Sequence, residues 1–159
     1  MMNKVYLGID IGGTAVKFGL VDENGNILHK DEFSVSFDGY ETPILKTVLE
    51  KTEYFVASSG LAFTEISGIG VSATGQIDSE KGEVIGSAGH IKNWVGSKIK
   101  ESFEKKYSVK TIVINDANSA ALGEKWIGAG RGYKNIVAIT IGTGVGGGII
   151  VDDKILLGK

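Results

Sequence analysis

Residues 8–22 read GIDIGGTAVKFGLVD, and this stretch decides which fold the chain adopts. Apolar residues alternate with polar residues or glycine over residues 5–10 and again over 15–22, which is the period of a half-buried β-strand. Gly12, Gly13 and Thr14 lie between the two runs. Two strand patterns joined by a short glycine turn predict a β-hairpin at the start of the chain.

Composition narrows the class of protein. The chain has 159 residues, a formal net charge of −2, 42 % hydrophobic and 23 % charged residues, which suits a folded domain with its own core. The near-neutral charge gives no reason to expect a nucleic-acid partner. No stretch approaches the roughly 20 apolar residues that span a bilayer, no signal peptide is visible, and cysteine is absent. We therefore expect no membrane partner and a reducing, cytoplasmic location.

Strand and helix patterns alternate along the rest of the chain. A helix is expected to begin at Pro43 and to stop at Gly60, because apolar residues recur between them at helical spacing. The remaining patterns predict helices at 97–107 and 116–128, and strands at 27–35, 66–73, 110–115, 135–142 and 145–151. This mixture is typical of an α/β fold.

The end of the chain is similar to its beginning. Residues 8–28 and 139–157 each read as a strand, a Gly/Thr turn, a second strand, a polar turn and a third strand. Such internal similarity predicts two related units. We expect a first domain over residues 1–128, and the opening hairpin of a truncated second domain over 129–159.

The stretch IGTGVGGGIIV, residues 141–151, contains the spacing G-x-G-x-x-G of dinucleotide-binding loops. That fingerprint requires a helix directly after the glycines, because the helix N-terminus holds the pyrophosphate. Here β-branched residues and the turn Asp152-Asp153 follow instead. A G-x-x-x-x-G-K-[ST] loop is absent from the sequence as well. Both classes of nucleotide-binding loop are therefore excluded.

The surviving interpretation is a pair of glycine turns whose backbone N–H groups bind phosphate without a helix. Thr143 adds a hydroxyl donor to the later turn, and Lys17 can offset phosphate charge near the earlier one. The carboxylate of Asp10 would repel bare phosphate, so it implies Mg²⁺ held through water. The alternative is that both turns are merely tight hairpins whose glycines need a positive φ. One such turn alone favours that alternative, whereas two matching turns favour phosphate binding.

Four motifs together resemble the ROK family of repressors, open reading frames and sugar kinases. They are GIDIGGTAVKFGLVD, GIGVSATGQID, INDANSAALGE and IGTGVGGGIIV, in family order and over almost the whole chain. The resemblance implies the RNase H-like fold of the sugar kinase, actin and heat-shock ATPase superfamily. We accordingly expect an N-terminal domain with a mixed sheet flanked by helices, plus the first strands of the second domain.

The resemblance also implies roles for individual residues. Asp116 matches the family's catalytic aspartate, Asn115 a sugar-hydroxyl ligand, and Gly75 a segment that lines the sugar pocket. The ATP phosphates are implied to lie between two sets of residues: Asp10, Gly12, Gly13 and Thr14 in the first, and Gly142, Thr143, Gly144, Gly146 and Gly147 in the second.

A catalytic role for Asp116 is also supported by chemistry that does not depend on the resemblance. A carboxylate near a sugar hydroxyl can accept its proton during attack on the γ-phosphoryl group of ATP. The alternative is that Asn115 or Asp116 only caps the helix that starts there. The local sequence leaves these two interpretations even, and the resemblance favours catalysis.

The implied function is an ATP-dependent sugar kinase acting on glucose, N-acetylmannosamine or a β-glucoside. A sugar-sensing regulator of the same family is the alternative, although Asp10 lies too close to the N-terminus for a preceding DNA-binding module. The family's later sugar motifs, its cysteine-rich zinc site and its adenine pocket are absent from these residues. We therefore expect the chain alone to be inactive. Its last hairpin should self-associate, as in a homodimer, or pack on a neighbouring surface, or be disordered.

Overall fold

The computed structural model describes residues 4–87, 91–142 and 144–157. Its larger sheet has five strands in the order β3-β2-β1-β4-β7. The strands are β1 (Val5–Ile11), β2 (Ala15–Asp22), β3 (Ile27–Ser34), β4 (Ile66–Ala73) and β7 (Thr111–Asn115). β1, β2 and β3 form an antiparallel meander, whereas β1, β4 and β7 run parallel. The predicted hairpin and the mixed sheet are thus confirmed.

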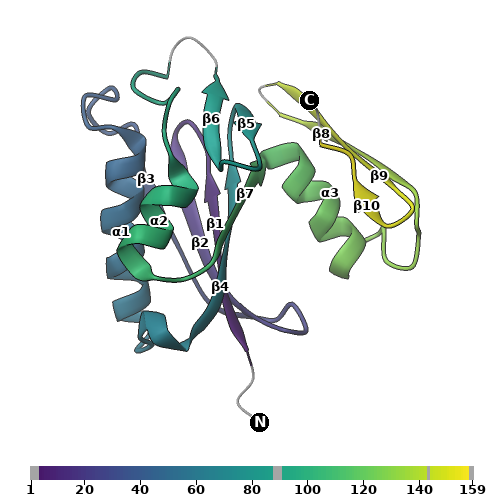
Figure 1. The fold of residues 1–159 in the computed structure, drawn as a ribbon, viewed down its shortest axis with the longest axis horizontal. Helices are drawn as coiled ribbons and strands as arrows, with labels where there is room; N and C mark the ends of the chain where they lie inside the picture. Colours follow the sequence, from purple (N-terminus) through teal and green to yellow (C-terminus); the bar gives the residue numbers. More distant parts are fainter. Residues whose placement is uncertain (1–3, 88–90, 143, 158–159) are drawn as a thin grey trace.

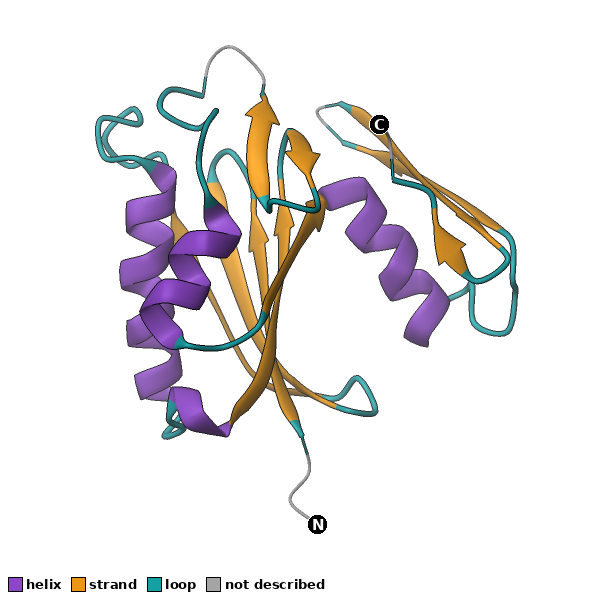
Figure 2. Cartoon of the chain, in the orientation of Figure 1, coloured by secondary structure: helices purple, strands orange, loops and turns teal. Residues whose placement is uncertain are grey.

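One face of this sheet carries the core. The helices α1 (Ile44–Ser58) and α2 (Ile99–Tyr107) cover that face, as Figures 1 and 2 show. Alternate apolar residues of β1 and β2 point into it, and Phe18 stacks on Phe55 of α1 with 5.2 Å between ring centroids. Burial of these side chains is the main force that holds the helices on the sheet.

Two helix boundaries differ by one or two residues from the prediction. Pro43 is the N-cap of α1 rather than its first residue, and the chain leaves the helix into Gly60, whose φ of +78° favours glycine. The second helix was expected from Ser97 but begins at Ile99, because Lys98 has the non-helical angles φ −86° and ψ 75°. Between the two helices lie the short 3₁₀ helix η1 (Phe63–Glu65) and the two-stranded sheet of β5 (Gln76–Asp78) and β6 (Glu83–Gly86).

A second antiparallel meander ends the chain. It consists of β8 (Ile136–Ile141), β9 (Val145–Val151) and β10 (Lys154–Ile155), in the order β10-β9-β8. The helix α3 (Asp116–Ile127) starts directly after β7 and packs on the inner face of this sheet. A Cβ on Gly148 would lie 2.6 Å from the Cβ of Ala121, so glycine is what allows the close approach. The hairpin was expected to self-associate, to pack on a neighbouring surface or to be disordered. Its inner face packs on a neighbouring surface, that of α3.

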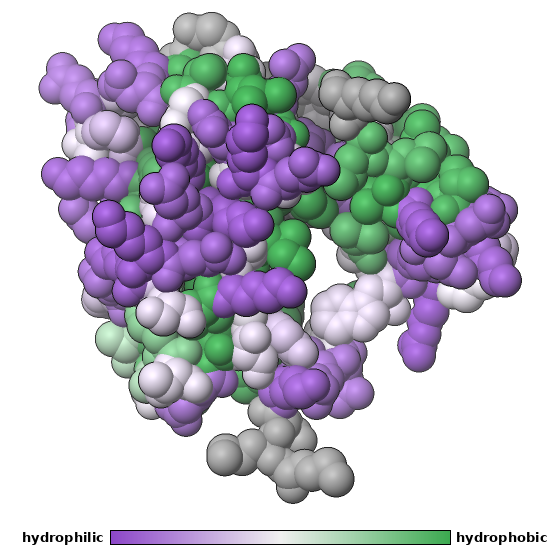
Figure 3. All heavy atoms as spheres, in the orientation of Figure 1, coloured by the Kyte–Doolittle hydropathy of each residue, from purple (hydrophilic) through white to green (hydrophobic). Residues whose placement is uncertain are grey.

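The outer face of the β8–β9 sheet is exposed and apolar. Cross-strand pairing places Val137 with Ile149 and Ile141 with Val145 on this face. The apolar side chains there are exposed to between 42 % and 84 %: Val137, Ile139, Ile141, Val145, Ile149 and Val151. Figure 3 shows apolar surface gathered over this part of the molecule. Among the described residues, no helix is both long and apolar enough to cross a bilayer.

Candidate active site

Three parallel strands end in one row. In the register of the sheet, Ile11 of β1 is paired with Ala73 of β4, and Ala73 is paired with Asn115 of β7. The residues that follow therefore meet at one edge of the sheet. They are the β1–β2 turn (Gly12, Gly13, Thr14), the β4–β5 turn (Thr74, Gly75) and the start of α3 at Asp116. The carboxyl ends of parallel strands are where ligands bind in open α/β sheets.

The β1–β2 turn is held by one backbone hydrogen bond and one side-chain hydrogen bond. The N–H of Gly12 donates to the carbonyl of Ala15 at 2.9 Å, and the hydroxyl of Tyr40 donates to the carbonyl of Gly13 at 2.8 Å. Neither Gly12 nor Gly13 has a positive φ, so the interpretation that these glycines serve a left-handed turn is wrong. A Cβ on Gly13 would instead lie 3.1 Å from Cδ1 of Ile91. The tight space beside Gly13, not its backbone conformation, is what disfavours a larger residue here.

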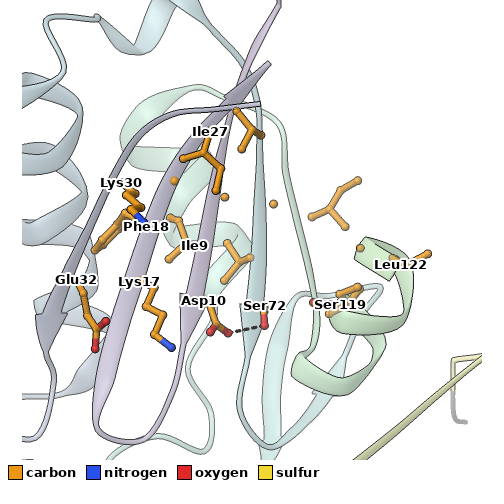
Figure 4. A pocket seen from close by; sticks show the side chains of 18 of the residues that line it. Ile9, Asp10, Lys17, Phe18, Ile27, Lys30, Glu32, Ser72, Ser119 and Leu122 are labelled. Atoms are coloured by element: carbon orange, nitrogen blue, oxygen red, sulfur yellow. Dashed lines mark hydrogen bonds between the residues drawn. The ribbon is translucent and has the colours of Figure 1, made fainter. Parts of the chain in front are cut away.

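Asp10 and Lys17 project from the face of the sheet opposite the core. They are cross-strand partners in the β1–β2 hairpin, and Oδ1 of Asp10 accepts a hydrogen bond of 2.7 Å from the hydroxyl of Ser72 on β4. These side chains line a hollow of about 1070 Å³ between the open sheet face and α3, to which α3 contributes Ser119. Figure 4 shows Asp10 and Ser72 joined by their hydrogen bond, with Lys17 alongside, and Figure 3 shows the opening.

The β4–β5 turn requires glycine for two reasons. Gly75 has a φ of +103°, and a Cβ there would collide with the carbonyl oxygen of Gly86. The turn is also bonded to β7, the neighbour of β4 in the sheet, because Nδ2 of Asn115 donates to the carbonyl of Gly75 at 2.8 Å. The structure therefore brings Gly75 and Asn115 together, as a shared sugar site requires.

Asn115 is the N-cap of α3. Its Oδ1 accepts from the N–H of Ala117 at 2.9 Å, and Oδ1 of Asp116 also accepts from that N–H, at 2.8 Å. Capping by Asn115 is thus part of the structure. Asp116, the first residue of α3, is exposed at the row of strand ends.

The β8–β9 turn offers a second set of backbone groups. The N–H of Gly142 donates to the carbonyl of Gly144 at 2.9 Å, and both glycines are exposed. Thr143 lies outside the described residues. Gly146 faces α3, where a Cβ would lie 2.9 Å from the Cβ of Ala117, whereas Gly147 lies on the outer face. β9 continues as a strand to Val151, which agrees with the exclusion of a dinucleotide-binding loop.

The amino-acid sequence of this chain is similar to those of known sugar kinases. The model of the ROK family matches residues 6–159. The chain belongs to the ROK family. A glucokinase of Thermotoga maritima is 34 % identical over 153 residues, which are 96 % of this chain and 46 % of that protein. A β-glucoside kinase of Listeria innocua is 35 % identical over 150 residues, 94 % of this chain and 47 % of that protein.

A solved ROK glucokinase supports the same assignment. The enzyme of Streptomyces griseus, in complex with glucose and AMPPNP, has a TM-score of 0.82 and 31 % identity, covering 98 % of this chain and 47 % of that one. The expected fold of the sugar kinase and actin-like ATPase superfamily is thereby confirmed. This ROK chain spans about half the length of the relatives it matches.

Sequence reasoning missed Ser72, Tyr40 and Trp94 of this ROK chain. Ser72 was detectable in principle, since it alternates with the apolar residues of β4 and therefore shares a face with Asp10 if the strands are aligned. Tyr40 and Trp94 lie in loops, and only the tertiary structure shows that they contact the strand-end turns.

Proposed function

We propose that this chain forms the sugar- and phosphate-binding half of an ATP-dependent sugar kinase. The observation that carries the proposal is the common register row of Ile11, Ala73 and Asn115, because it brings two glycine turns and the carboxylate of Asp116 to one edge of the sheet. A kinase needs these parts together: a phosphate site, an acceptor site and a base between them.

In this proposal the sugar lies over the β4–β5 turn, beside Gly75 and Asn115. Asp116 accepts the proton of the reacting hydroxyl as that oxygen attacks the γ-phosphorus of ATP, and ADP leaves with the electron pair of the broken bond. Asn115 uses one amide hydrogen on Gly75 and its oxygen on Ala117. Its second amide hydrogen remains for a sugar hydroxyl.

The phosphates of ATP are assigned to the β1–β2 turn (Gly12, Gly13, Thr14), to Lys17, and to Gly142, Thr143, Gly144, Gly146 and Gly147. Mg²⁺, when bound, neutralises charge on the transferring phosphoryl group. Asp10 fits a magnesium held through water, because Ser72 fixes the orientation of its carboxylate. Among the described residues no three His, Cys, Asp or Glu side chains form a metal cluster. A single carboxylate with phosphate and water is the arrangement Mg²⁺ commonly adopts with nucleotides.

The acceptor is assigned to the hexose class. Relatives with kinase names include glucokinases and β-glucoside kinases, and a structural neighbour is described as an N-acetylmannosamine kinase. We also assign the reaction to the cytoplasm. We assign the division of the chain into residues 1–128 and 129–159 to the two domains of such a kinase.

Self-association is the second part of the proposal. Exposed apolar faces of this kind favour contact with another surface, and the outer face of the β8–β9 sheet includes Ile139 and Ile141, exposed to 67 % and 84 %. A homodimer of the 159-residue chain would cover it. Sedimentation of the double variant Ile139→Thr, Ile141→Thr tests this, with a shift toward monomer as the expected result and an unchanged distribution as the contrary one.

Activity is tested in a chimeric kinase. Residues 1–157 of this chain are joined to the part of the Thermotoga maritima glucokinase beyond its matched region, with the parent enzyme as positive control. Release of ADP is measured with glucose, N-acetylmannosamine and a β-glucoside. We expect turnover on at least one sugar and none by the 159-residue chain alone. A folded chimera that phosphorylates none of them would contradict the proposed function.

A further inference from the structure

The segment from Ile91 to Trp94 contacts both strand-end turns. Cδ1 of Ile91 lies 3.1 Å from where a Cβ of Gly13 would stand, so it packs directly on the β1–β2 turn. Three residues later, Nε1 of Trp94 donates a hydrogen bond of 2.9 Å to the carbonyl of Thr74 in the β4–β5 turn. Trp94 is fully buried. One short segment therefore spans the two turns that a kinase must hold in register.

A second chain of contacts runs through Tyr40. Its hydroxyl donates to the carbonyl of Gly13 at 2.8 Å, and its own carbonyl accepts from Nδ2 of Asn93 at 3.3 Å. Tyr40 and Asn93 both have a positive φ, of 67° and 56°. A non-glycine residue adopts this conformation at a cost, and it persists where surrounding contacts impose it. The path from Gly13 through Tyr40 and Asn93 to Trp94 is thus a built connection.

The β4–β5 turn is fastened from three sides. The N–H of Thr74 donates to the carbonyl of Ile11 at 2.9 Å, Trp94 donates to the carbonyl of Thr74, and Asn115 donates to the carbonyl of Gly75. The bonds from Ile11 and Asn115 come from strands of the sheet, whereas the bond from Trp94 comes from a loop. Without the indole N–H, the carbonyl of Thr74 would lose its donor, and the turn would be held only by its bonds to the sheet strands.

We propose that Trp94 is a positioning residue, which fixes the β4–β5 turn for the acceptor sugar and, through Asn93 and Tyr40, couples it to the β1–β2 turn. The inference rests on the proposed kinase function for its consequence in catalysis. Its structural part, that the turn depends on the indole N–H, stands apart from that function. The two parts are therefore tested separately.

The structural part is tested by hydrogen exchange of the 159-residue chain. Trp94→Phe keeps an aromatic ring in the buried site and removes only the donor. We expect the amide of Thr74 to exchange about tenfold faster, as the loss of one buried hydrogen bond implies. The amide of Val71, in the middle of β4, should change little. Trp126→Phe is the matched control, since it removes an indole N–H from a side chain that is 48 % exposed.

Two results of the exchange experiment would overturn the inference. One is an unchanged rate at Thr74 in Trp94→Phe. The other is an equal acceleration at Thr74 and Val71, because it would show a loss of global stability instead of a local release. Phe103→Leu, a core change on α2, calibrates what a purely global loss does to both amides.

The functional part is tested in the chimeric kinase. Trp94→Phe should raise the KM for the sugar about tenfold and leave the KM for ATP within about twofold, whereas Tyr40→Phe should act mainly on the KM for ATP. The double variant should depart from additivity, because the two residues are joined through Asn93. An active chimera in which Trp94→Phe leaves the sugar KM unchanged contradicts this inference. An inactive wild-type chimera contradicts the proposed function instead.

Discussion

Nδ2 of Asn115 donates a hydrogen bond of 2.8 Å to the carbonyl oxygen of Gly75, across 40 positions in the sequence. The bond joins the end of β7 to the turn that follows β4, and the same side chain caps α3 through its Oδ1. The residue before the proposed base therefore sets both the position of the helix that carries Asp116 and the shape of the β4–β5 turn. Removal of the Asn115 side-chain amide is therefore expected to disturb both the proposed sugar site and the position of Asp116.

Two substitutions separate these roles of Asn115. Asn115→Asp keeps an oxygen for the cap and loses the donor to Gly75, whereas Asn115→Ala loses both. We expect the aspartate variant to keep the urea midpoint of the 159-residue chain and the alanine variant to lose about 1 kcal/mol of stability. In the chimeric kinase both should raise the sugar KM. Equal loss of stability in the two variants would show that the cap is not the stabilising contact.

Ser72 provides a test of the proposed magnesium site. Ser72→Ala removes the hydrogen bond that orients the carboxylate of Asp10. In the chimeric kinase we expect the Mg²⁺ concentration for half-maximal rate to rise about tenfold, since partners that orient a metal-binding carboxylate typically have effects of this size. Ser102→Ala, on the surface of α2, is the control. If the Mg²⁺ concentration for half-maximal rate does not change, the proposal that Asp10 holds the metal is contradicted.

The contact between β9 and α3 predicts a difference between adjacent glycines. A Cβ on Gly148 would lie 2.6 Å from the Cβ of Ala121 and 2.7 Å from the carbonyl oxygen of Ala117, whereas one on Gly147 would meet only the carbonyl of Ala138 at 3.8 Å. Gly148→Ala should therefore destabilise the chain by about 1–3 kcal/mol through overpacking. Gly147→Ala should be neutral or slightly stabilising. Urea unfolding measures both, and the reverse order would refute the packing described for this sheet.

Acid should weaken the turn between β2 and β3. Hydrogen bonds from the side chain and the backbone of Asn26, and from Asn24, lower the pKa of Asp22 below its ordinary value of 3.8. A depressed pKa in the folded state gives stability that is present above the unfolded-state value and is lost as the pH falls through the folded-state value.

Urea midpoints of the wild type and of Asp22→Asn should therefore differ above pH 3.8 and converge as the pH falls below the folded-state pKa of Asp22. Asp31→Asn, on the exposed strand β3, serves as the control. A difference between wild type and Asp22→Asn that persists unchanged in acid would show that the charge of Asp22 has no part in holding the turn.

The sequence predicted the elements well where a period was visible. Alternation over 5–10 and 15–22 identified β1 and β2, and helical spacing after Pro43 identified α1. Helix ends were less accurate, because Lys98 departs from helical angles for tertiary reasons that no local pattern records.

The candidate site was predictable as residues but not as an arrangement. The motifs named Asp10, Gly75 and Asp116, yet their common edge depends on the register of β1, β4 and β7, and parallel register is set by long-range packing. The alternative that Gly12 and Gly13 need a positive φ was wrong, and the sequence could not show this, since Ile91, the residue that approaches Gly13, is distant in the sequence. The sequence did not indicate that Trp94 contacts the β4–β5 turn.

The central claim is that Asp116 is the base of a sugar kinase, and one comparison tests it most directly. The rate of sugar phosphorylation is measured for the chimeric kinase and for its Asp116→Asn variant, which keeps the size of the side chain and removes the proton acceptor. We predict a fall in kcat of about 10²- to 10⁴-fold, the contribution of a positioned general base, with the sugar KM little changed. A variant that retains the wild-type kcat would contradict the account.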